Sequence, residues 1–582
     1  MQINERQKSW IKILISLGMI VAFGILVYVK QMGVYFETND DRIIAEILSG
    51  AYSTAPDPHV IHENYLLTLP LSSLYRITVN IPWYGLCLLL FHVLAWFVIE
   101  NSFLSRCEKW KEYCLVLAGL SGLFLGSLSL IGRIQFTSTA VMLAIAGYVA
   151  LIMEKNTKKG FIMFFLLELF SFFVRYKAML MIQPLGGITW LTLTLIQIAD
   201  AGWKKEVLSE KGKEIGKIIL IWGMIFALGG CGNIIGYHDI SWRNFLRFSE
   251  ARSQLFDYYG TPDYSEAKDI LKEYNVSKNE YEAFCNYNIL NWEVGTECVE
   301  KLVSFQKEKN QGQNNFMAAF RESFAEMGSE SLQKINRTCV ALWIMLIIGM
   351  ILERHLERMI PLLGILLIRT VLWTYLLYKG RMPARITYPL FTGEAILLFC
   401  VFAFFYLQEN NKMKLRNTAM AIMICSVTLL VGYNAGQVQY RFLKTENEGQ
   451  KIYMQGMQEM LDYCNNAPQK RFFWDGFSFN YYKGSALATN IYGPRNAMPF
   501  GNWFCNSPTE VERLKEYLSG DYQGIYFIAF DEGSMENYPA IKMLEEKLQS
   551  PAVLDDEITV STGITYLVWR IGNYFLQRHN AK

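Results

Sequence analysis

The sequence predicts a polytopic α-helical membrane protein, and three observations support this fold class. Of the 582 residues, 52% are hydrophobic and only 19% are charged, which is too apolar for an ordinary soluble enzyme. About eleven apolar stretches are long enough for transmembrane helices. The Lys and Arg residues concentrate in alternate loops between these stretches. A formal net charge of +2, without any basic tract, argues against a nucleic-acid partner.

The first apolar run, 11–29, is long enough to cross a hydrocarbon core of about 30 Å. Because it is longer than the apolar core of a signal peptide and has no small-residue cleavage site, we interpret it as a retained anchor. The other ten predicted spans follow at 83–99, 113–131, 135–153, 161–174, 178–198, 218–236, 339–352, 359–378, 388–407 and 417–436.

The positive-inside rule places the N-terminus, with Arg6 and Lys8, in the cytoplasm. Every predicted cytoplasmic loop is then basic, through Arg106, Lys109 and Lys111; Lys155, Lys158 and Lys159; Lys204, Lys205, Lys211, Lys213 and Lys217; Arg354 and Arg358; and Lys412, Lys414 and Arg416. We therefore expect a multi-pass protein of the cell membrane, with a membrane domain over 1–436. Its extracytoplasmic parts are the first loop 31–82, an insertion 237–335 and a C-terminal domain 437–582.

The extracytoplasmic parts have patterns of their own. Apolar stripes at helical spacing over 41–50 and 62–77 predict two short helices in the membrane interface. The insertion is polar and helical in pattern, with helices predicted at 264–274, 278–291, 295–309 and 314–328. In the C-terminal domain, helices at 445–463, 508–519 and 535–549 and strands at 471–475, 524–530 and 563–571 predict a small α/β fold. Four cysteines lie in these parts and are candidates for disulfides, namely Cys285, Cys298, Cys464 and Cys505.

Two adjacent acids, Asp40 and Asp41, follow the first span within about ten residues. Neighbouring side chains point in different directions, so one carboxylate can face a cavity while the other orients it or binds a cation. The alternative is that Asn39 or Asp40 caps the helix that begins near Arg42. A cap does not require a second acid, which favours a functional site.

Six cations are exceptions to the positive-inside rule, because they lie in three short turns predicted to be outside. A structural reading, contact with lipid headgroups and snorkelling of the side chains, accounts for part of them. Three turns that bring cations to the same rim would also form an anion-binding ring beside the two acids, and Arg suits phosphate. The six are Arg133, Arg175, Lys177, Lys379, Arg381 and Arg385.

Other polar residues are weaker candidates. His59 and His62 lie three residues apart in the first loop and are candidate ligands for a divalent cation, although surface histidines are the simpler reading. Glu168, Arg369 and Glu394 lie within predicted spans, where charges normally pair or line a polar cavity. For Arg369 we expect a structural Glu–Arg pair between helices.

An acidic pair in the first outer loop (Asp40 and Asp41), interfacial helices, many spans, rim cations and a soluble C-terminal domain together resemble the GT-C glycosyltransferase superfamily. This superfamily includes protein O-mannosyltransferases and lipid A aminoarabinose transferases. The resemblance covers about 1–436. It implies transfer of a sugar from a polyprenyl-phosphate donor to a cell-envelope glycan or protein, by inverting single displacement. One of the two acids would be the catalytic base, and the six cations are the pool for a phosphate clamp.

Three alternatives remain open. A polysaccharide polymerase or ligase also acts on lipid-linked sugars, but such proteins tend to carry functional Arg and His in a late outer loop. A transporter or flippase often has inverted repeats with interrupted helices, which this sequence lacks. A non-catalytic relative of the transferases is the third.

Overall fold

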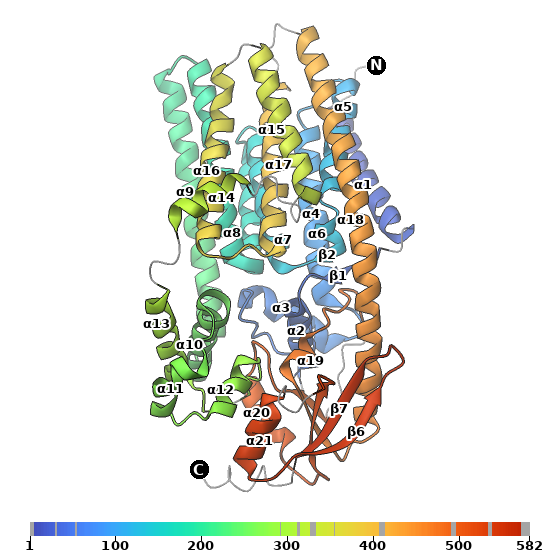
Figure 1. The fold of residues 1–582 in the computed structure, drawn as a ribbon. Helices are drawn as coiled ribbons and strands as arrows, with labels where there is room; N and C mark the ends of the chain where they lie inside the picture. The colour runs from blue at the N-terminus through green and yellow to red at the C-terminus, as the bar shows by residue number, and fades with distance from the viewer. Residues whose placement is uncertain are drawn as a thin grey trace.

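The computed structural model describes residues 5–29, 32–52, 55–290, 293–310, 315–325, 333–353, 356–406, 414–489, 496–533 and 538–571. Parts of some predicted elements lie outside these residues, namely 291, 314, 326–328, 407 and 535–537. Long helices gather at one end of the molecule, and shorter helices and a sheet form the other end (Figure 1).

The bundle of long helices is the membrane part of this multi-pass protein. Its helices are α1 (Glu5–Val29), α4 (Trp83–Leu104), α5 (Trp110–Gly126), α7 (Phe136–Met153), α8 (Lys158–Asp200), α9 (Lys205–Gly236), α15 (Gln333–Glu353), α16 (Ile360–Tyr378), α17 (Ala384–Tyr406) and α18 (Lys414–Asn465). Among the described residues, seven of these helices are long and apolar enough to cross a membrane: α4, α7, α8, α9, α16, α17 and α18. The count of eleven spans therefore stays a prediction.

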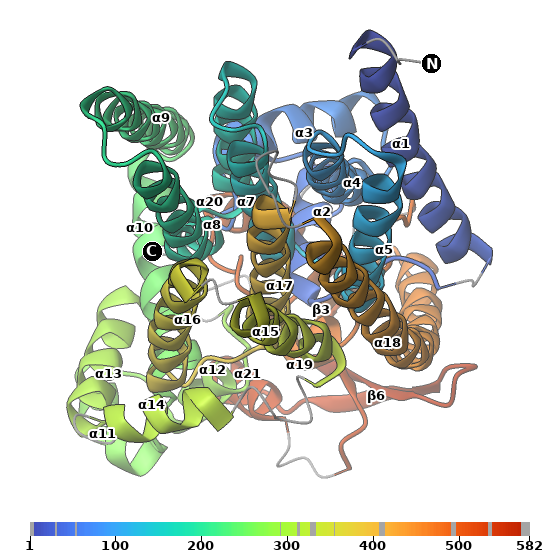
Figure 2. The ribbon, with the colours of Figure 1, turned by 90° about the horizontal axis from the view of Figure 1, so that it is seen from above.

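The centre of the bundle is formed by α7 and α17, whose apolar windows are each 94% buried, whereas that of α9 is only 22% buried. Seen from above, α1 and α9 lie at opposite edges of the bundle (Figure 2). The apolar face that α9 leaves uncovered is the surface expected to contact lipid.

Helix α8 contains two predicted spans, 161–174 and 178–198, within one 43-residue element. Its backbone leaves the helical conformation at Arg175, with φ −162° and ψ 93°. Gln183 on the second arm donates a hydrogen bond of 2.9 Å to Glu168 on the first arm, so the two arms lie side by side. The chain therefore reverses direction at Arg175.

Helix α18 is 52 residues long and continues from the bundle into the outer part of the molecule (Figure 1). The last predicted span, 417–436, and the predicted helix 445–463 are thus one element. The predicted domain boundary at residue 437 falls inside this helix.

The first outer loop contains the strand β1 (Tyr35–Phe36) and the helices α2 (Asn39–Ser49) and α3 (Tyr65–Ile77). A short helix, α6 (Ser129–Gly132), leads into β2 (Arg133–Ile134), which pairs in parallel with β1. Ile44, Ile47 and Leu48 of α2 are completely buried and belong to the same apolar core as the membrane helices. This burial fixes α2 on the outer end of the bundle.

The described residues of the insertion are mainly helical. They form α10 (Ile240–Gln254), the π-helical turn η1 (Leu255–Tyr259), α11 (Tyr264–Glu273), α12 (Lys278–Cys285), α13 (Thr296–Lys309) and α14 (Phe316–Ala325). A 3-10 turn, η3 (Leu356–Met359), precedes α16. Helix α14 packs on the membrane helix α16 (Figure 1).

The C-terminal region forms a mixed five-stranded sheet in the order β4-β3-β5-β7-β6. Its strands are β3 (Arg471–Trp474), β4 (Ala497–Pro499), β5 (Ile525–Phe530), β6 (Val553–Thr559) and β7 (Thr565–Ile571), with β3 parallel to β4 and β5 and β7 antiparallel to β5 and β6. The helices α20 (Pro508–Tyr517) and α21 (Pro539–Leu548) cover one face of the sheet. The outer end of α18 covers the other face through Met457, Met460 and Cys464.

The C-terminal region docks directly on the first outer loop. The short helix α19 (Gly476–Asn480) accepts a hydrogen bond of 3.0 Å from Asn39 Nδ2 at the Asn480 carbonyl. Phe36 N donates to the Gly484 carbonyl at 3.1 Å, and Ala486 N donates to the Val34 carbonyl at 3.0 Å. The four cysteines proposed as disulfide candidates are free thiols: Cys285, Cys298, Cys464 and Cys505.

Candidate functional site

The acidic pair lies in the first turn of α2, but neither acid caps that helix. The N-cap is Thr38, whose extended backbone precedes the first helical residue, Asn39. Two carboxylates in the first turn are favourable because they face the positive end of the helix dipole. The capping interpretation therefore does not explain either Asp40 or Asp41.

Asp41 is completely buried and serves as a hydrogen-bond acceptor for its surroundings. Its Oδ2 accepts from Thr38 Oγ1 at 3.0 Å, and its Oδ1 accepts from the backbone N of Phe136 at 3.1 Å. Burial, with the nearby charge of Asp40, raises the pKa of Asp41 to about 8. This carboxyl group joins α2 to the start of α7.

A tyrosine connects Asp41 to a second buried acid, Glu63. Tyr84 Oη lies 3.2 Å from Asp41 Oδ1 and 2.8 Å from Glu63 Oε1. A phenol has one proton to donate, so one of the two carboxyl groups must hold a proton when both contacts are hydrogen bonds. Burial raises the pKa of Glu63 to about 8 as well, which agrees with a proton held by one of these two carboxyl groups.

Asp40 points away from this network and faces a cavity of about 410 Å³. Arg385 Nη1 lies 3.5 Å from Asp40 Oδ2. Burial raises the pKa of Asp40 above its ordinary value, although Arg385 and Arg175 oppose this shift. The cavity is lined by Asn39, Asp40, Ile43, Tyr287, Gly476, Phe477, Asn480, Tyr481, Asn502 and Trp503.

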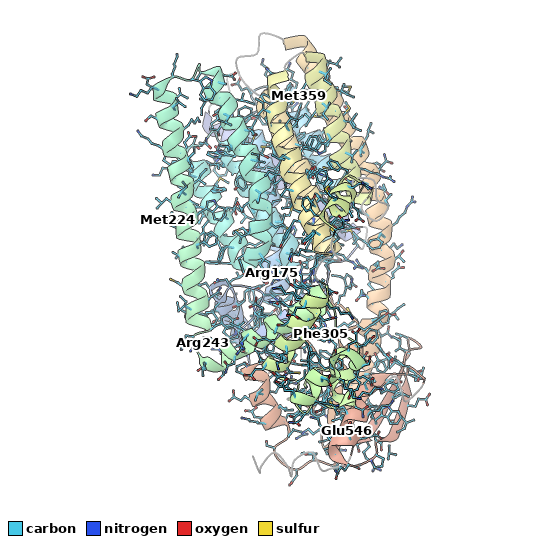
Figure 3. The ribbon with its side chains drawn as sticks, turned by 60° about the vertical axis from the view of Figure 1, so that its left-hand side comes forward. Arg175, Met224, Arg243, Phe305, Met359 and Glu546 are labelled. Atoms are coloured by element: carbon cyan, nitrogen blue, oxygen red, sulfur yellow. The ribbon has the colours of Figure 1, made fainter. Side chains whose placement is uncertain are left out.

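The cations Arg175 and Arg385 come together beside Asp40. Arg175 lies at the reversal of α8, at the level where the membrane helices meet the outer part (Figure 3). Its Nη1 donates to the His62 carbonyl at 3.1 Å, and its guanidinium lies 5.0 Å from the centre of the Phe136 ring. Because the chain turns here, the side chain is held at the end of the membrane bundle that faces α2 and the C-terminal region.

The other predicted cations have different surroundings. Arg381 pairs with Asp257 at 3.6 Å and lies over the ring of Tyr258. Lys177 and Lys379 are exposed. Arg133 is buried and forms ion pairs with Glu37 and Glu446.

His59 and His62 do not share a set of partners. His59 Nδ1 lies 2.6 Å from Asp57 Oδ1, and its ring stacks on Trp242 at 4.4 Å. His62 packs against Trp503 at 4.5 Å, and burial together with Arg175 keeps its pKa well below 6.5. Within the described residues, no three His, Cys, Asp or Glu side chains are placed to hold a metal ion together.

Two buried charges in the bundle have partners within it. Arg369 Nε lies 3.1 Å from Glu394 Oε1, so the expected ion pair between helices is confirmed. Trp343 Nε1 donates to the same carboxylate at 2.7 Å.

The sequence missed residues from distant segments that surround Asp40. Arg252 in the insertion is only 5% exposed, donates to Tyr287 Oη at 2.8 Å, and adds its positive charge to those acting on Asp40. Asn480 and Trp503 come from the C-terminal region. None of these residues belongs to a motif, and only the docking of distant segments brings them to Asp40.

No family model matches the sequence, and it has no match among curated proteins. Among solved structures, the chain is similar to ArnT from Cupriavidus metallidurans, in a crystal structure bound to undecaprenyl phosphate. The TM-score is 0.33 and the sequence identity is 9%, over 95% of this chain and 98% of that one. A TM-score at this level establishes neither a common fold nor a common activity.

Proposed function

We propose that this protein is an integral-membrane glycosyltransferase. It would move a sugar from a polyprenyl-phosphate donor to an acceptor of the cell envelope on the extracytoplasmic side. One observation carries the proposal: a carboxylate, Asp40, faces a cavity at the outer end of an apolar bundle, with Arg385 at 3.5 Å. The charges of Arg175 and Arg252 act on the same carboxylate.

The chemistry needs a base and an anion-binding group. Asp40 takes the proton of the acceptor hydroxyl while that oxygen forms a bond to the anomeric carbon of the sugar. The bond from this carbon to the phosphate oxygen breaks, and the polyprenyl phosphate leaves with the electron pair. Because the departing phosphate is already a stable anion, it needs cations rather than a proton. Arg385 and Arg175 are placed to supply that charge.

Asp40 is a better candidate for the base than Asp41. Asp41 does not line the cavity that Asp40 faces, accepts hydrogen bonds from α4 and α7, and has its pKa raised to about 8 by burial. A carboxyl group that keeps its proton at neutral pH cannot accept one from a substrate. We therefore assign Asp41 the role of holding α2 in place.

The test is transfer from a labelled polyprenyl-phosphate sugar by the full-length protein in lipid nanodiscs. Asp40→Asn keeps the shape and removes the base, so we expect a loss of at least about 10²-fold in kcat. Asp555→Asn is a matched control, because its carboxylate also pairs with a cation, Lys470 at 3.1 Å, and does not line the cavity. Activity of Asp40→Asn within a few-fold of the wild type would refute the assignment. Movement of the donor across the membrane without transfer would identify a flippase instead.

A further inference from the structure

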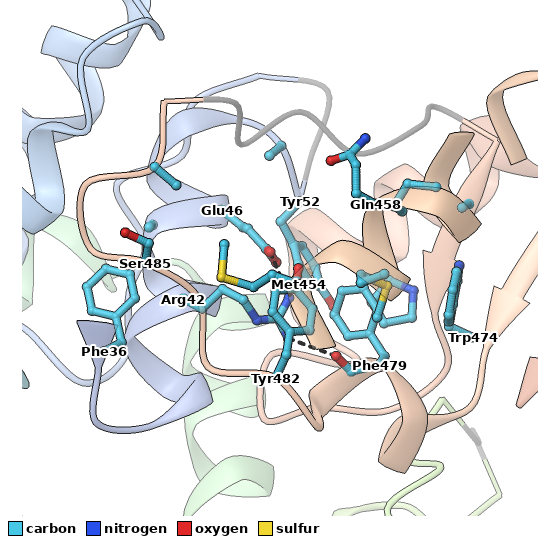
Figure 4. A pocket seen from close by; sticks show the side chains of 18 of the residues that line it. Phe36, Arg42, Glu46, Tyr52, Met454, Gln458, Trp474, Phe479, Tyr482 and Ser485 are labelled. Atoms are coloured by element: carbon cyan, nitrogen blue, oxygen red, sulfur yellow. Dashed lines mark hydrogen bonds and ion pairs between the residues drawn. The ribbon is translucent and has the colours of Figure 1, made fainter. Parts of the chain in front are cut away.

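A second cavity lies on the other side of α2, between the first outer loop, the outer half of α18 and the C-terminal sheet (Figure 4). Its volume is about 140 Å³. An engineered protein cavity of about 150 Å³ holds a benzene ring, so this one has room for a single six-membered ring. Asp40 is not among its lining residues.

The walls of this cavity are largely aromatic. Phe36, Tyr52, Trp474, Phe479 and Tyr482 contribute rings from four different segments of the chain (Figure 4). Flat aromatic and apolar surfaces with a few convergent polar groups are typical of sites for small ligands.

Two buried hydrogen-bond donors at the cavity have no partner among the described residues. One is Trp474 Nε1, on a side chain that is 0% exposed, and the other is Arg42 Nε, on a side chain that is 4% exposed. Buried donors are nearly always satisfied in native proteins. A ligand that offers oxygen acceptors would satisfy both.

The three charged side chains that line the cavity, Arg42, Arg513 and Glu46, are already engaged by groups of the protein. Arg42 Nη1 donates to Glu46 Oε1 at 2.7 Å, and Arg42 Nη2 donates to the Phe479 carbonyl at 3.0 Å. Arg513 donates to the carbonyl of Tyr52 and, at 3.0 Å, to that of Ala497. An anionic ligand would meet the Glu46 carboxylate, and a cationic one would meet two guanidinium groups. A neutral ring with many hydroxyl groups is the ligand that fits donors and acceptors together.

We propose that this cavity binds one neutral sugar ring of the acceptor, so that the acceptor is a glycan rather than a protein. The inference rests on the proposed function. Asp40 and Arg42 are two residues apart on α2, about 200° around the helix, and therefore lie on opposite faces. A helix is about 10 Å across, so an acceptor that fills this cavity and also reaches Asp40 has more than one ring.

Binding is tested by saturation-transfer NMR on the full-length protein in nanodiscs, with the methyl glycosides of glucose, mannose, galactose and N-acetylglucosamine as probes. At least one probe should bind saturably to the wild type and at least tenfold more weakly to Trp474→Phe and Glu46→Gln. Trp569→Phe is the matched control, because its indole nitrogen also lacks a partner in the same sheet but does not line the cavity. The proposal would be overturned if the wild type bound none of the probes, or if Trp474→Phe and Glu46→Gln bound them as tightly as the wild type.

A folding defect is separated from a binding defect by a variant at the exposed rim, Gln458→Ala, which should also weaken the probe that binds. Asp40→Asn separates this inference from the proposed function, since it should bind the probe as the wild type does. In the transfer assay, Glu46→Gln should raise KM for a glycan acceptor and leave KM for the donor unchanged. If Asp40→Asn kept full activity, the base assignment would fail while the binding result stood.

Discussion

At the scale of single residues, two neighbouring acids of α2 have opposite surroundings. Asp41 is buried and accepts hydrogen bonds from two other elements, whereas the side chain of Asp40 is 23% exposed and faces a cavity. The difference follows from the helix, which turns by about 100° from one residue to the next. One side chain therefore points into the bundle and the other towards the C-terminal region.

The first prediction at the residue scale concerns Arg385, the arginine beside Asp40. If Arg385 binds the departing phosphate, Arg385→Ala should lower kcat by about 10²-fold, the usual effect of removing one group that stabilises developing charge. Arg385→Lys should restore only part of the loss, because a lysine cannot bind phosphate in a bidentate manner. The measurement is kcat for sugar transfer. Arg247→Ala, which removes an exposed ion pair with Glu300, is the control and should change little.

The second prediction concerns the buried acid that shares a proton with Asp41. The pKa of Glu63 rises from 4.5 to about 8 on burial, so the folded protein holds a proton that the unfolded chain releases between these values. Stability is therefore fully present below pH 4.5 and is lost as the pH rises towards 8, by up to about 1.4 kcal/mol per pH unit.

Glu63→Gln cannot titrate and should reduce this loss. The measurement is the Tm at pH 6 and pH 8, with a smaller decrease expected for the variant than for the wild type. Glu300→Gln, at an exposed ion pair, should behave as the wild type. An equal decrease in all three proteins would contradict the proposed proton.

At the scale of elements, α4 and the C-terminal region meet at a glycine. A Cβ atom at Gly85 would lie 1.8 Å from the carbonyl oxygen of Ala486, so no side chain fits without moving the segment that contacts β1. Because α19 directly precedes this segment in the chain and lines the cavity of Asp40, we expect the same contact to influence that cavity.

We expect Gly85→Ala to destabilise the protein by about 1–3 kcal/mol, as overpacking does, and to reduce transfer activity. Thermal unfolding and the transfer assay measure the two effects. Gly223→Ala on α9 is the control, because a Cβ atom there meets nothing within 4 Å. Equal stability and activity of the two variants would show that the contact does not position the C-terminal region.

At the scale of the whole molecule, the orientation in the membrane is the prediction to be tested. Basic loops place Lys158 in the cytoplasm and the insertion, with Lys268, outside. Both side chains are exposed. In a background with the exposed Cys114 and Cys231 replaced by serine, a membrane-impermeant maleimide should label Lys268→Cys in intact cells. Lys158→Cys should react only after lysis, and the reverse pattern would invert the topology.

The sequence predicted local structure well where one strong signal controls it. Long apolar runs located the long helices, and short runs rich in aromatic and other apolar residues located the strands at 471–475 and 524–530, where β3 and β5 lie. Prediction from the sequence failed where the packing of distant segments decides the surroundings of a side chain. A cation in an outer turn has the same sequence signal whether it lies beside Asp40, as Arg385 does, or pairs with glutamates, as Arg133 does.

By itself, the sequence determined that the chain is a multi-pass membrane protein with two acids just beyond its first long helix, because transfer of apolar residues into lipid depends on composition alone. The tertiary structure decided which acid faces a cavity, which cations act on it, and that Asn480 and Trp503 line that cavity. These contacts join segments more than 200 residues apart. Such neighbours are set by the packing of the whole chain and leave no local pattern to read.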